Sequence, residues 1–226
     1  MAGTAVRHKN IGAHATILIH ALRCPLVPGL FATLEGIDGS GKTTVAAKVA
    51  TSLEGAGIPV ARTTEPTQTW RGDAVKWAIE RDVDPISETF LFLADRETHG
   101  RQIRAWLDGG KLVLSDRYAD STYAYQGARL AGKKEDPVRW LRELSGPFVV
   151  PPAVTYFLAV PPETALARIR DRPKRVRFEE RAFLAAVDAN YRQLAKEPTW
   201  VTVDATRPKD EVAGEIAEDL EGRYRR

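Results

Sequence analysis

The clearest chemistry in this sequence lies in the glycine-rich segment 36–43, which reads Gly-Ile-Asp-Gly-Ser-Gly-Lys-Thr. Its spacing fits G-x-x-x-x-G-K-[ST], a pattern whose backbone N–H groups turn inward and bind phosphate. Lys42 supplies a mobile positive charge for the β- and γ-phosphates of a nucleoside triphosphate, and Thr43 supplies a hydroxyl for Mg²⁺. We therefore predict that ATP is held by Gly36, Ile37, Asp38, Gly39, Ser40, Gly41, Lys42, Thr43 and Thr44.

An accidental glycine-rich turn is the alternative, and the flanking sequence argues against it. The segment Phe31–Glu35 is apolar enough to form a buried strand, and Thr43–Leu53 carries helical periodicity. A phosphate-binding loop needs this order of strand, loop and helix, because the helix N-terminus adds its dipole to the same anion. The motif predicts triphosphate binding but does not identify the acceptor.

Three further segments combine charged and aromatic residues, at 88–96, 116–118 and 120–127. The pair Asp116-Arg117 directly follows an apolar strand. Ligands bind at the carboxyl ends of strands in open α/β sheets, so this pair favours a binding site over an ion pair that merely closes a loop. The segment 120–127 joins polar and aromatic side chains, a combination suited to holding a base and a sugar.

The elements that must position these residues alternate along the chain. Strands are predicted at 31–35, 60–63, 111–115, 153–160 and 200–203, and helices at 43–53, 85–107, 138–144, 164–170, 182–194 and 209–223. This alternation predicts an α/β fold of the P-loop NTPase type, with a five-stranded parallel sheet flanked by helices on both faces. We expect a single domain over residues 30–226.

Length and composition limit the fold class, the partners and the location of the protein. A chain of 226 residues with 43% apolar residues suits one α/β domain. The net charge of +3 is too small to indicate a nucleic-acid binder by charge alone, and no apolar run approaches the roughly 20 residues of a membrane span. The single cysteine, Cys24, leaves no intrachain disulfide, which favours a reducing, cytoplasmic location.

Residues 1–29 precede the first predicted strand and are treated as an N-terminal extension outside the core. They hold three of the four histidines and Cys24, but the spacing fits no zinc pattern. The apolar run Ala15–Leu22 follows basic residues, as in a signal peptide, but lacks a small-x-small cleavage site. The extension has no assigned function.

Taken in order, the motifs resemble those of thymidylate kinase. The resemblance rests on an acidic third residue in the glycine-rich loop, Glu65-Pro66, Leu-Phe-x-Ala-Asp-Arg ending at residue 96, Asp-Arg-Tyr at 116–118, and Ser-Thr-x-Ala-Tyr-Gln-Gly at 121–127. Each motif is weak alone, but the ordered set extends from Phe31 toward the C-terminus. The resemblance implies transfer of the γ-phosphoryl group of ATP to dTMP, giving dTDP for dTTP synthesis, with Mg²⁺ as cofactor.

The resemblance also implies a role for each matched position. Asp38 would accept a hydrogen bond from the 3′-hydroxyl of the acceptor sugar, and Tyr125 would crowd the 2′ carbon. Phe92 would stack on the pyrimidine, and Arg96 would reach its carbonyl edge. The other implied positions are Thr122 and Gln126 beside the base, Glu65, Arg117 at the acceptor phosphate, and Asp116 holding Mg²⁺ with Thr43, directly or through water.

Ordinary structural roles compete with several of these assignments. Phe92 lies in an apolar helix and could belong to the core, and Tyr125 could pack on the sheet. Arg96 could pair with Glu97 or Asp95 in solvent, where an ion pair contributes little.

A basic stretch at 168–180 resembles a kinase lid that brings positive charge to the migrating phosphoryl group and excludes water. A solvated basic helix face and a nucleic-acid patch are the alternatives. We expect Arg172 and Arg177 to join Lys42 and Arg117 as catalytic residues. The stretch departs from the family in having Val176 where an acidic residue commonly precedes the arginine.

The segment Thr63–Thr67 also departs from the family, because it lacks the usual arginine before Glu65 and Gly-Gly after Pro66. Arg62 or Arg71 could supply the missing phosphate contact. Downstream, Asp204-Ala205 resembles the loop that contacts the donor's adenine.

ATP and dTMP are the expected small-molecule partners, and the resemblance implies a homodimer formed through the long helices. No nucleic-acid or membrane partner is expected. Two competing functions remain: a related kinase for another nucleoside monophosphate or a deoxynucleoside, and a non-catalytic nucleotide-binding module.

Overall fold

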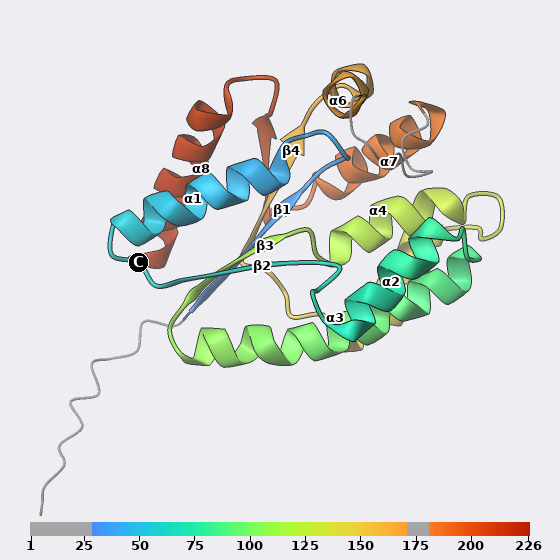
Figure 1. Cartoon of the computed structure of the whole chain (residues 1–226), viewed down its shortest axis with the longest axis horizontal. Coiled ribbons are helices and arrows are strands. Elements are labelled where there is room, and N and C mark those ends of the chain that lie inside the picture. The colour runs from blue at the N-terminus through green and yellow to red at the C-terminus, as the bar shows by residue number, and fades with distance from the viewer. Residues whose placement is uncertain (1–28, 171–180) are drawn as a thin grey trace, which may run out of the picture.

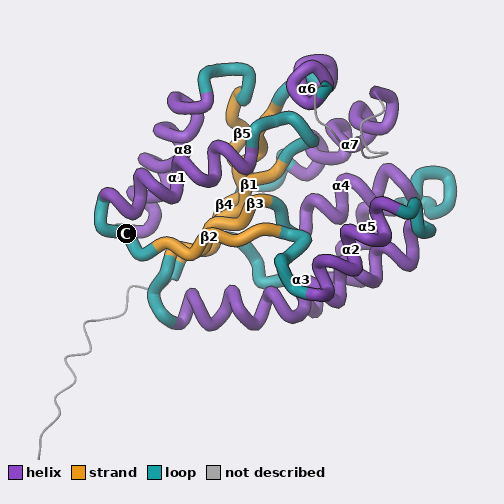
Figure 2. Tube along the Cα trace, viewed as in Figure 1, coloured by secondary structure: helices purple, strands orange, loops and turns teal. Residues whose placement is uncertain are grey.

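A computed structural model describes residues 29–170 and 181–226. Five strands form one parallel sheet in the order β2-β3-β1-β4-β5 (Figures 1 and 2). Their bounds are β1 Leu30–Glu35, β2 Val60–Thr64, β3 Leu112–Asp116, β4 Val154–Ala159 and β5 Trp200–Asp204. The predicted α/β fold with a five-stranded parallel sheet is confirmed.

Helices cover both faces of this sheet (Figure 1). They are α1 Lys42–Gly55, α2 Trp70–Glu80, α3 Pro85–Asp108, α4 Ala119–Arg129, α5 Pro137–Ser145, α6 Pro162–Ile169, α7 Arg181–Leu194 and α8 Lys209–Tyr224, with a 3₁₀ turn at Gly146–Phe148. The elements predicted from periodicity differ from these bounds by no more than two residues at either end.

The alternation of side chains along β1 explains why an apolar cluster lies on each face of the sheet. Ala32 and Leu34 point into an apolar cluster formed with α1 and α8, whereas Phe31 points into a second cluster formed with α3, α4, α5 and α7. Because successive side chains of a strand face opposite sides of a sheet, a central strand must be apolar on both. All five residues of β3 are accordingly buried.

Two helices, α2 and α4, carry no helical pattern that the sequence analysis recognised. Every residue of α4 from Ala119 to Gly127 is buried, so the helix lacks the polar stripe that marks an amphipathic segment. Helix α2 keeps Trp70 and Trp77 exposed, and its apolar residues therefore do not gather on the buried side. In both cases packing, rather than periodicity, accounts for the helix.

No helix in the described part of the chain is long and apolar enough to cross a membrane.

Candidate active site

The glycine-rich loop joins β1 to α1 and lines a polar cavity of about 330 Å³. Gly39 has φ of +89°, and a Cβ atom there would lie 2.3 Å from the Ala165 carbonyl oxygen. Only glycine allows this close approach together with a left-handed backbone. The cavity is lined by Asp38, Gly39, Gly41, Lys42, Thr43, Thr44, Arg117, Arg168 and Lys209.

Lys42 folds back into the loop. Its Nζ donates to the carbonyl oxygens of Gly36 and Ile37, both at 2.9 Å, and to Ser40 Oγ at 3.2 Å. Burial and, after it, the positive charge of Arg117 together lower the pKa of Lys42 to about 8, although the nearby carboxylates oppose the shift. A bound triphosphate would compensate this buried cation.

This lowered pKa predicts a pH dependence of ATP binding. Below pH 8 Lys42 carries its charge and attracts the triphosphate; above pH 8 the ligand-free protein loses it. We expect affinity for a non-hydrolysable ATP analogue to fall by up to about tenfold per pH unit above that value, because binding must then take up a proton. Titration calorimetry between pH 7 and pH 9.5 measures this directly.

The control is Lys42→Arg, whose guanidinium stays charged throughout the range. Whatever its absolute affinity for the ATP analogue, this variant should not show the additional fall in affinity with rising pH above pH 8. An equal slope in both proteins would assign the titration to another group.

A hydroxyl and a carboxylate meet beside the loop. Thr43 Oγ1 donates to Asp116 Oδ2 at 2.5 Å, and Asp116 lies at the carboxyl end of β3. The other carboxylate oxygen, Asp116 Oδ1, is buried and has no hydrogen-bond partner among the described residues. An unsatisfied carboxylate oxygen next to a hydroxyl suits Mg²⁺, which binds proteins through one or two such ligands and takes the rest from phosphates and water.

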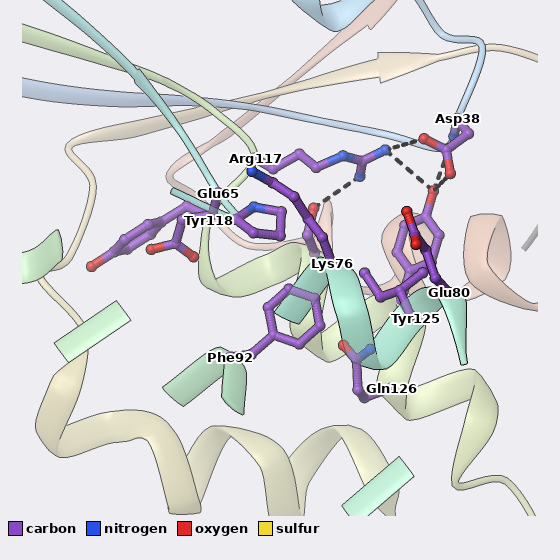
Figure 3. Close-up of a pocket in the computed structure, with 12 residues that line it drawn as sticks. Asp38, Glu65, Lys76, Glu80, Phe92, Arg117, Tyr118, Tyr125 and Gln126 are labelled. Carbon is purple, nitrogen blue, oxygen red and sulfur yellow. Dashed lines mark hydrogen bonds and ion pairs between the residues drawn. The ribbon is translucent and has the colours of Figure 1, made fainter. Parts of the chain in front are cut away.

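A second cavity, of about 280 Å³, shares Asp38 and Arg117 with the loop cavity, and Figure 3 shows the residues that line it. It approaches the size typical of small-molecule sites, roughly 300–1,000 Å³. Its lining is mixed apolar and charged: Asp38, Glu65, Pro66, Lys76, Ile79, Glu80, Phe92, Arg117, Tyr118, Ser121, Tyr125 and Gln126. We call it the acceptor cavity, and the loop cavity the donor cavity.

Arg117 stands between the two cavities. Its Nη2 donates to Asp38 Oδ1 at 2.6 Å, and its Nη1 donates to Ser121 Oγ at 3.0 Å and to the Gly36 carbonyl at 3.2 Å. The Tyr125 hydroxyl donates to Asp38 Oδ2 at 3.2 Å. Arg117 has φ of +71°, a backbone conformation that residues other than glycine rarely adopt.

The charges of this cluster fix its protonation. Burial works to raise the pKa of Asp38, but the positive charges of Arg117 and Lys42 outweigh it and hold that pKa below its usual value. Burial raises the pKa of the Tyr125 hydroxyl. Asp38 is therefore an anion, and an acceptor of hydrogen bonds, at neutral pH.

Arg96 lies in the middle of α3 and is fully buried. Its Nη2 donates to Glu65 Oε2 at 2.7 Å and to Thr122 Oγ1 at 2.8 Å, so the alternative of a solvent-exposed pair with Glu97 or Asp95 is wrong. Glu65 is held from its other side by His99 Nδ1 at 2.9 Å. Arg96 Nη1 is buried and has no hydrogen-bond partner within the described ranges.

Thr122 and Glu65 both contact the buried Arg96. The Thr122 side chain bonds to Arg96 and does not line the acceptor cavity, while Glu65 lines it and anchors Arg96. Both residues position the arginine. The sequence held no signal that Glu65 would contact Arg96, because the two residues are 31 positions apart.

Two aromatic residues with competing structural roles reach the acceptor cavity. Phe92 is half-buried, lines the cavity and belongs to neither apolar cluster, which favours a ligand contact over a core role. The Tyr125 ring packs edge-on against Tyr191 in the core while its hydroxyl contacts Asp38. Tyr125 therefore packs in the core and also lines the acceptor cavity.

The structure adds residues that the sequence analysis did not select. Arg168 and Lys209 line the donor cavity, and Arg168 Nη1 and Nη2 both donate to the Ala205 carbonyl at 3.0 Å, beside the predicted adenine loop. Lys76, Ile79 and Glu80 of α2 line the acceptor cavity. Arg168 falls in the basic stretch already noted, whereas the residues of α2 had no signal because the helix was not recognised.

The two arginines considered as substitutes for the missing phosphate contact lie elsewhere. Arg71 stacks on Trp70, with its guanidinium carbon 4.5 Å from the ring centroid, and Arg62 lines a separate cavity beside Thr43 and Asp116. Lys76 of α2, which pairs with Asp73, lines the acceptor cavity together with Arg117. The predicted lid arginines, Arg172 and Arg177, lie outside the described residues.

The sequence is similar to known proteins of one family. The sequence matches the family model for thymidylate kinase over residues 34–216. A probable thymidylate kinase of Methanoculleus marisnigri is 44% identical over 191 residues, which cover 83% of this chain and 92% of the relative. Relatives of the same name from Methanosarcina mazei and Halobacterium salinarum are 41% and 43% identical, over 83% and 81% of this chain and 93% and 91% of their own lengths. These matches confirm the resemblance drawn from the ordered motifs. The chain belongs to the thymidylate kinase family.

Proposed function

We propose that this protein is a dTMP kinase, which transfers the γ-phosphoryl group of ATP to dTMP and releases dTDP and ADP. The observation that carries the proposal is that Asp38 and Arg117 line both cavities. A phosphate in the donor cavity and a phosphate in the acceptor cavity would meet at this pair. Membership of the family supports the same conclusion.

On the donor side, the loop amides and Lys42 would hold the triphosphate of ATP, with Arg168 and Lys209 lining the same cavity. Thr43 and Asp116 would hold Mg²⁺, which when bound neutralises phosphate charge and orients the β- and γ-phosphates. The unpartnered Asp116 Oδ1 supports this assignment.

On the acceptor side, two unsatisfied buried atoms support recognition of thymine. Arg96 Nη1 is a donor and Gln126 Oε1 is an acceptor, and neither has a hydrogen-bond partner in the described part of the chain. Thymine offers the matching groups, a carbonyl at position 4 and an N–H at position 3. Satisfying both would remove the cost of leaving them unpaired, about 1–3 kcal/mol each. Phe92 would stack on the ring.

At the sugar, Asp38 would accept a hydrogen bond from the 3′-hydroxyl. Tyr125, held against Asp38 by its hydroxyl, would occupy the space that a 2′-hydroxyl needs. Deoxyribonucleotides would therefore be preferred over ribonucleotides.

The chemistry needs no strong general base, because a phosphate oxygen of dTMP is already a nucleophile. That oxygen attacks the γ-phosphorus, the bond to the β–γ bridging oxygen breaks, and ADP leaves with the electron pair. Lys42 and Arg117 would place positive charge on either side of the migrating group. Arg172 and Arg177 would add charge from the lid and help exclude water.

A panel of acceptors tests the proposal. With ATP and Mg²⁺ held saturating, we expect the highest kcat/KM with dTMP, lower values with dUMP and dCMP, and the lowest with UMP. ADP should form only when a monophosphate is present. A preference for UMP, or ADP formation that ignores the acceptor, would contradict a dTMP kinase.

We also propose a homodimeric, cytoplasmic enzyme. Family resemblance supports the dimer, and the exposed Trp70, Trp77 and Phe90 on α2 and α3 supply apolar surface suited to an interface.

A further inference from the structure

The amide of Gln126 is held in one orientation by a buried ion pair behind the acceptor cavity. Gln126 Nε2 donates to Glu88 Oε1 at 2.8 Å, and Glu88 is fully buried in the first turn of α3. Arg129 Nη1 lies 2.9 Å from the same carboxylate oxygen. Arg129 itself is fixed by the Val83 carbonyl, which its Nη2 contacts at 2.9 Å.

The hydrogen-bonding chemistry of Glu88 allows only one orientation of the Gln126 amide. An ionised carboxylate only accepts hydrogen bonds, so Glu88 can face the NH₂ of Gln126 but not its oxygen. The amide oxygen must then point away from Glu88. Figure 3 shows that oxygen on the side of Phe92, at the end of the acceptor cavity far from Asp38.

We propose that Glu88 and Arg129 form an orientation lock that makes Gln126 an obligate hydrogen-bond acceptor, and so sets the enzyme against cytosine. The inference rests on the proposed dTMP kinase function. A glutamine free to rotate could accept from the N3–H of thymine or donate to the unprotonated N3 of cytosine. The locked glutamine accepts only, and a cytosine N3 placed against it would pair two acceptors.

Glu88 thus acts as a positioning residue: it affects base selectivity by orienting the amide of Gln126. A merely structural role for the ion pair would predict equal losses with every acceptor when it is changed. The ratio of kcat/KM for dTMP to kcat/KM for dCMP separates the two roles.

The test compares this ratio in the wild type, in Glu88→Gln and in Glu97→Gln. A glutamine side chain at position 88 can both donate and accept a hydrogen bond, so the amide of Gln126 is free to rotate by half a turn and exchange its oxygen and nitrogen. Glu97 is a matched control, because it undergoes the same chemical change on the same helix but pairs with Arg101 at the surface. We expect the ratio to fall about tenfold or more in Glu88→Gln and to stay at the wild-type value in Glu97→Gln.

A ratio within about threefold of wild type in folded Glu88→Gln would overturn the lock, even if both rates fell. If that variant is not recovered folded, Glu88→Asp decides by the same criterion, since it keeps the charge beside Arg129 but withdraws the oxygen from Nε2. An inactive wild type with dTMP would instead contradict the proposed function, so the two failures are distinct.

Discussion

Replacing Lys42 by alanine is expected to lower kcat on the order of 10³-fold, the largest loss from any single change in the donor cavity. The Nζ atom lies at the centre of the loop, held by two backbone carbonyls and Ser40. No other side chain occupies that point in the described residues. Steady-state assays with ATP and dTMP measure the effect.

The fold should survive this change. Burial of the Lys42 charge is itself costly, as its lowered pKa shows, so alanine removes that cost while leaving the Ile37 carbonyl without its side-chain donor. The Gly36 carbonyl keeps Arg117. We expect a change in unfolding free energy of no more than about 2 kcal/mol, measured by denaturant titration.

Lys48→Ala is the matched control, because Lys48 lies on the same helix, with 42% of its side chain exposed, and pairs with Asp210 at the surface. It should keep the wild-type rate. A near-normal rate in Lys42→Ala would contradict the role of Lys42 in phosphoryl transfer.

Replacing Arg117 by lysine is expected to lower kcat/KM for dTMP by about 10²- to 10³-fold although the charge is kept. The guanidinium contacts Asp38, Ser121 and the Gly36 carbonyl at once, with its two terminal nitrogens. A lysine has one nitrogen and cannot hold these partners and a phosphate in a fixed geometry. Both residues carry a Cβ, so the cost of the positive φ is the same in each protein.

We expect Arg117→Lys to change the kinetic constants for dTMP and not those for ATP. We expect the KM for ATP to change by less than about threefold, because Lys42 and the loop amides remain. Arg139→Lys on α5, where Arg139 pairs with Glu143 in solvent, is the control and should behave as wild type. A loss confined to ATP affinity would place Arg117 with the donor alone.

The residues that the sequence selected and that the structure gathers around the two cavities lie mostly within short contiguous motifs. The loop, Asp116-Arg117 and the residues around Tyr125 each follow a predicted strand or fall in a recognisable run. The strand bounds agreed closely because a buried parallel strand needs an unbroken apolar run. Family resemblance then supplied roles that no single motif could.

Contacts between distant positions could not be predicted in the same way. Arg96 is held by Glu65 and Thr122, and Gln126 by Glu88, partners that only the packing of α3 against β2 and α4 brings together. Neither periodicity nor local spacing encodes these pairs. Helix α2 was missed for a related reason: its tryptophans at 70 and 77 face solvent, which obscures an amphipathic pattern.

The left-handed backbone of Arg117 has an evolutionary consequence. A residue with a Cβ loses roughly 1–2 kcal/mol in this conformation, which glycine would avoid. Hydrogen bonds from the Arg117 amide to Leu34 and from Ser115 Oγ to the Arg117 carbonyl hold the chain in place despite that loss. Glycine would relieve this strain but would also remove the ion pair with Asp38 and leave that part-buried carboxylate without its partner. Laboratory evolution toward stability should therefore retain arginine at this position even without a separate selection for activity.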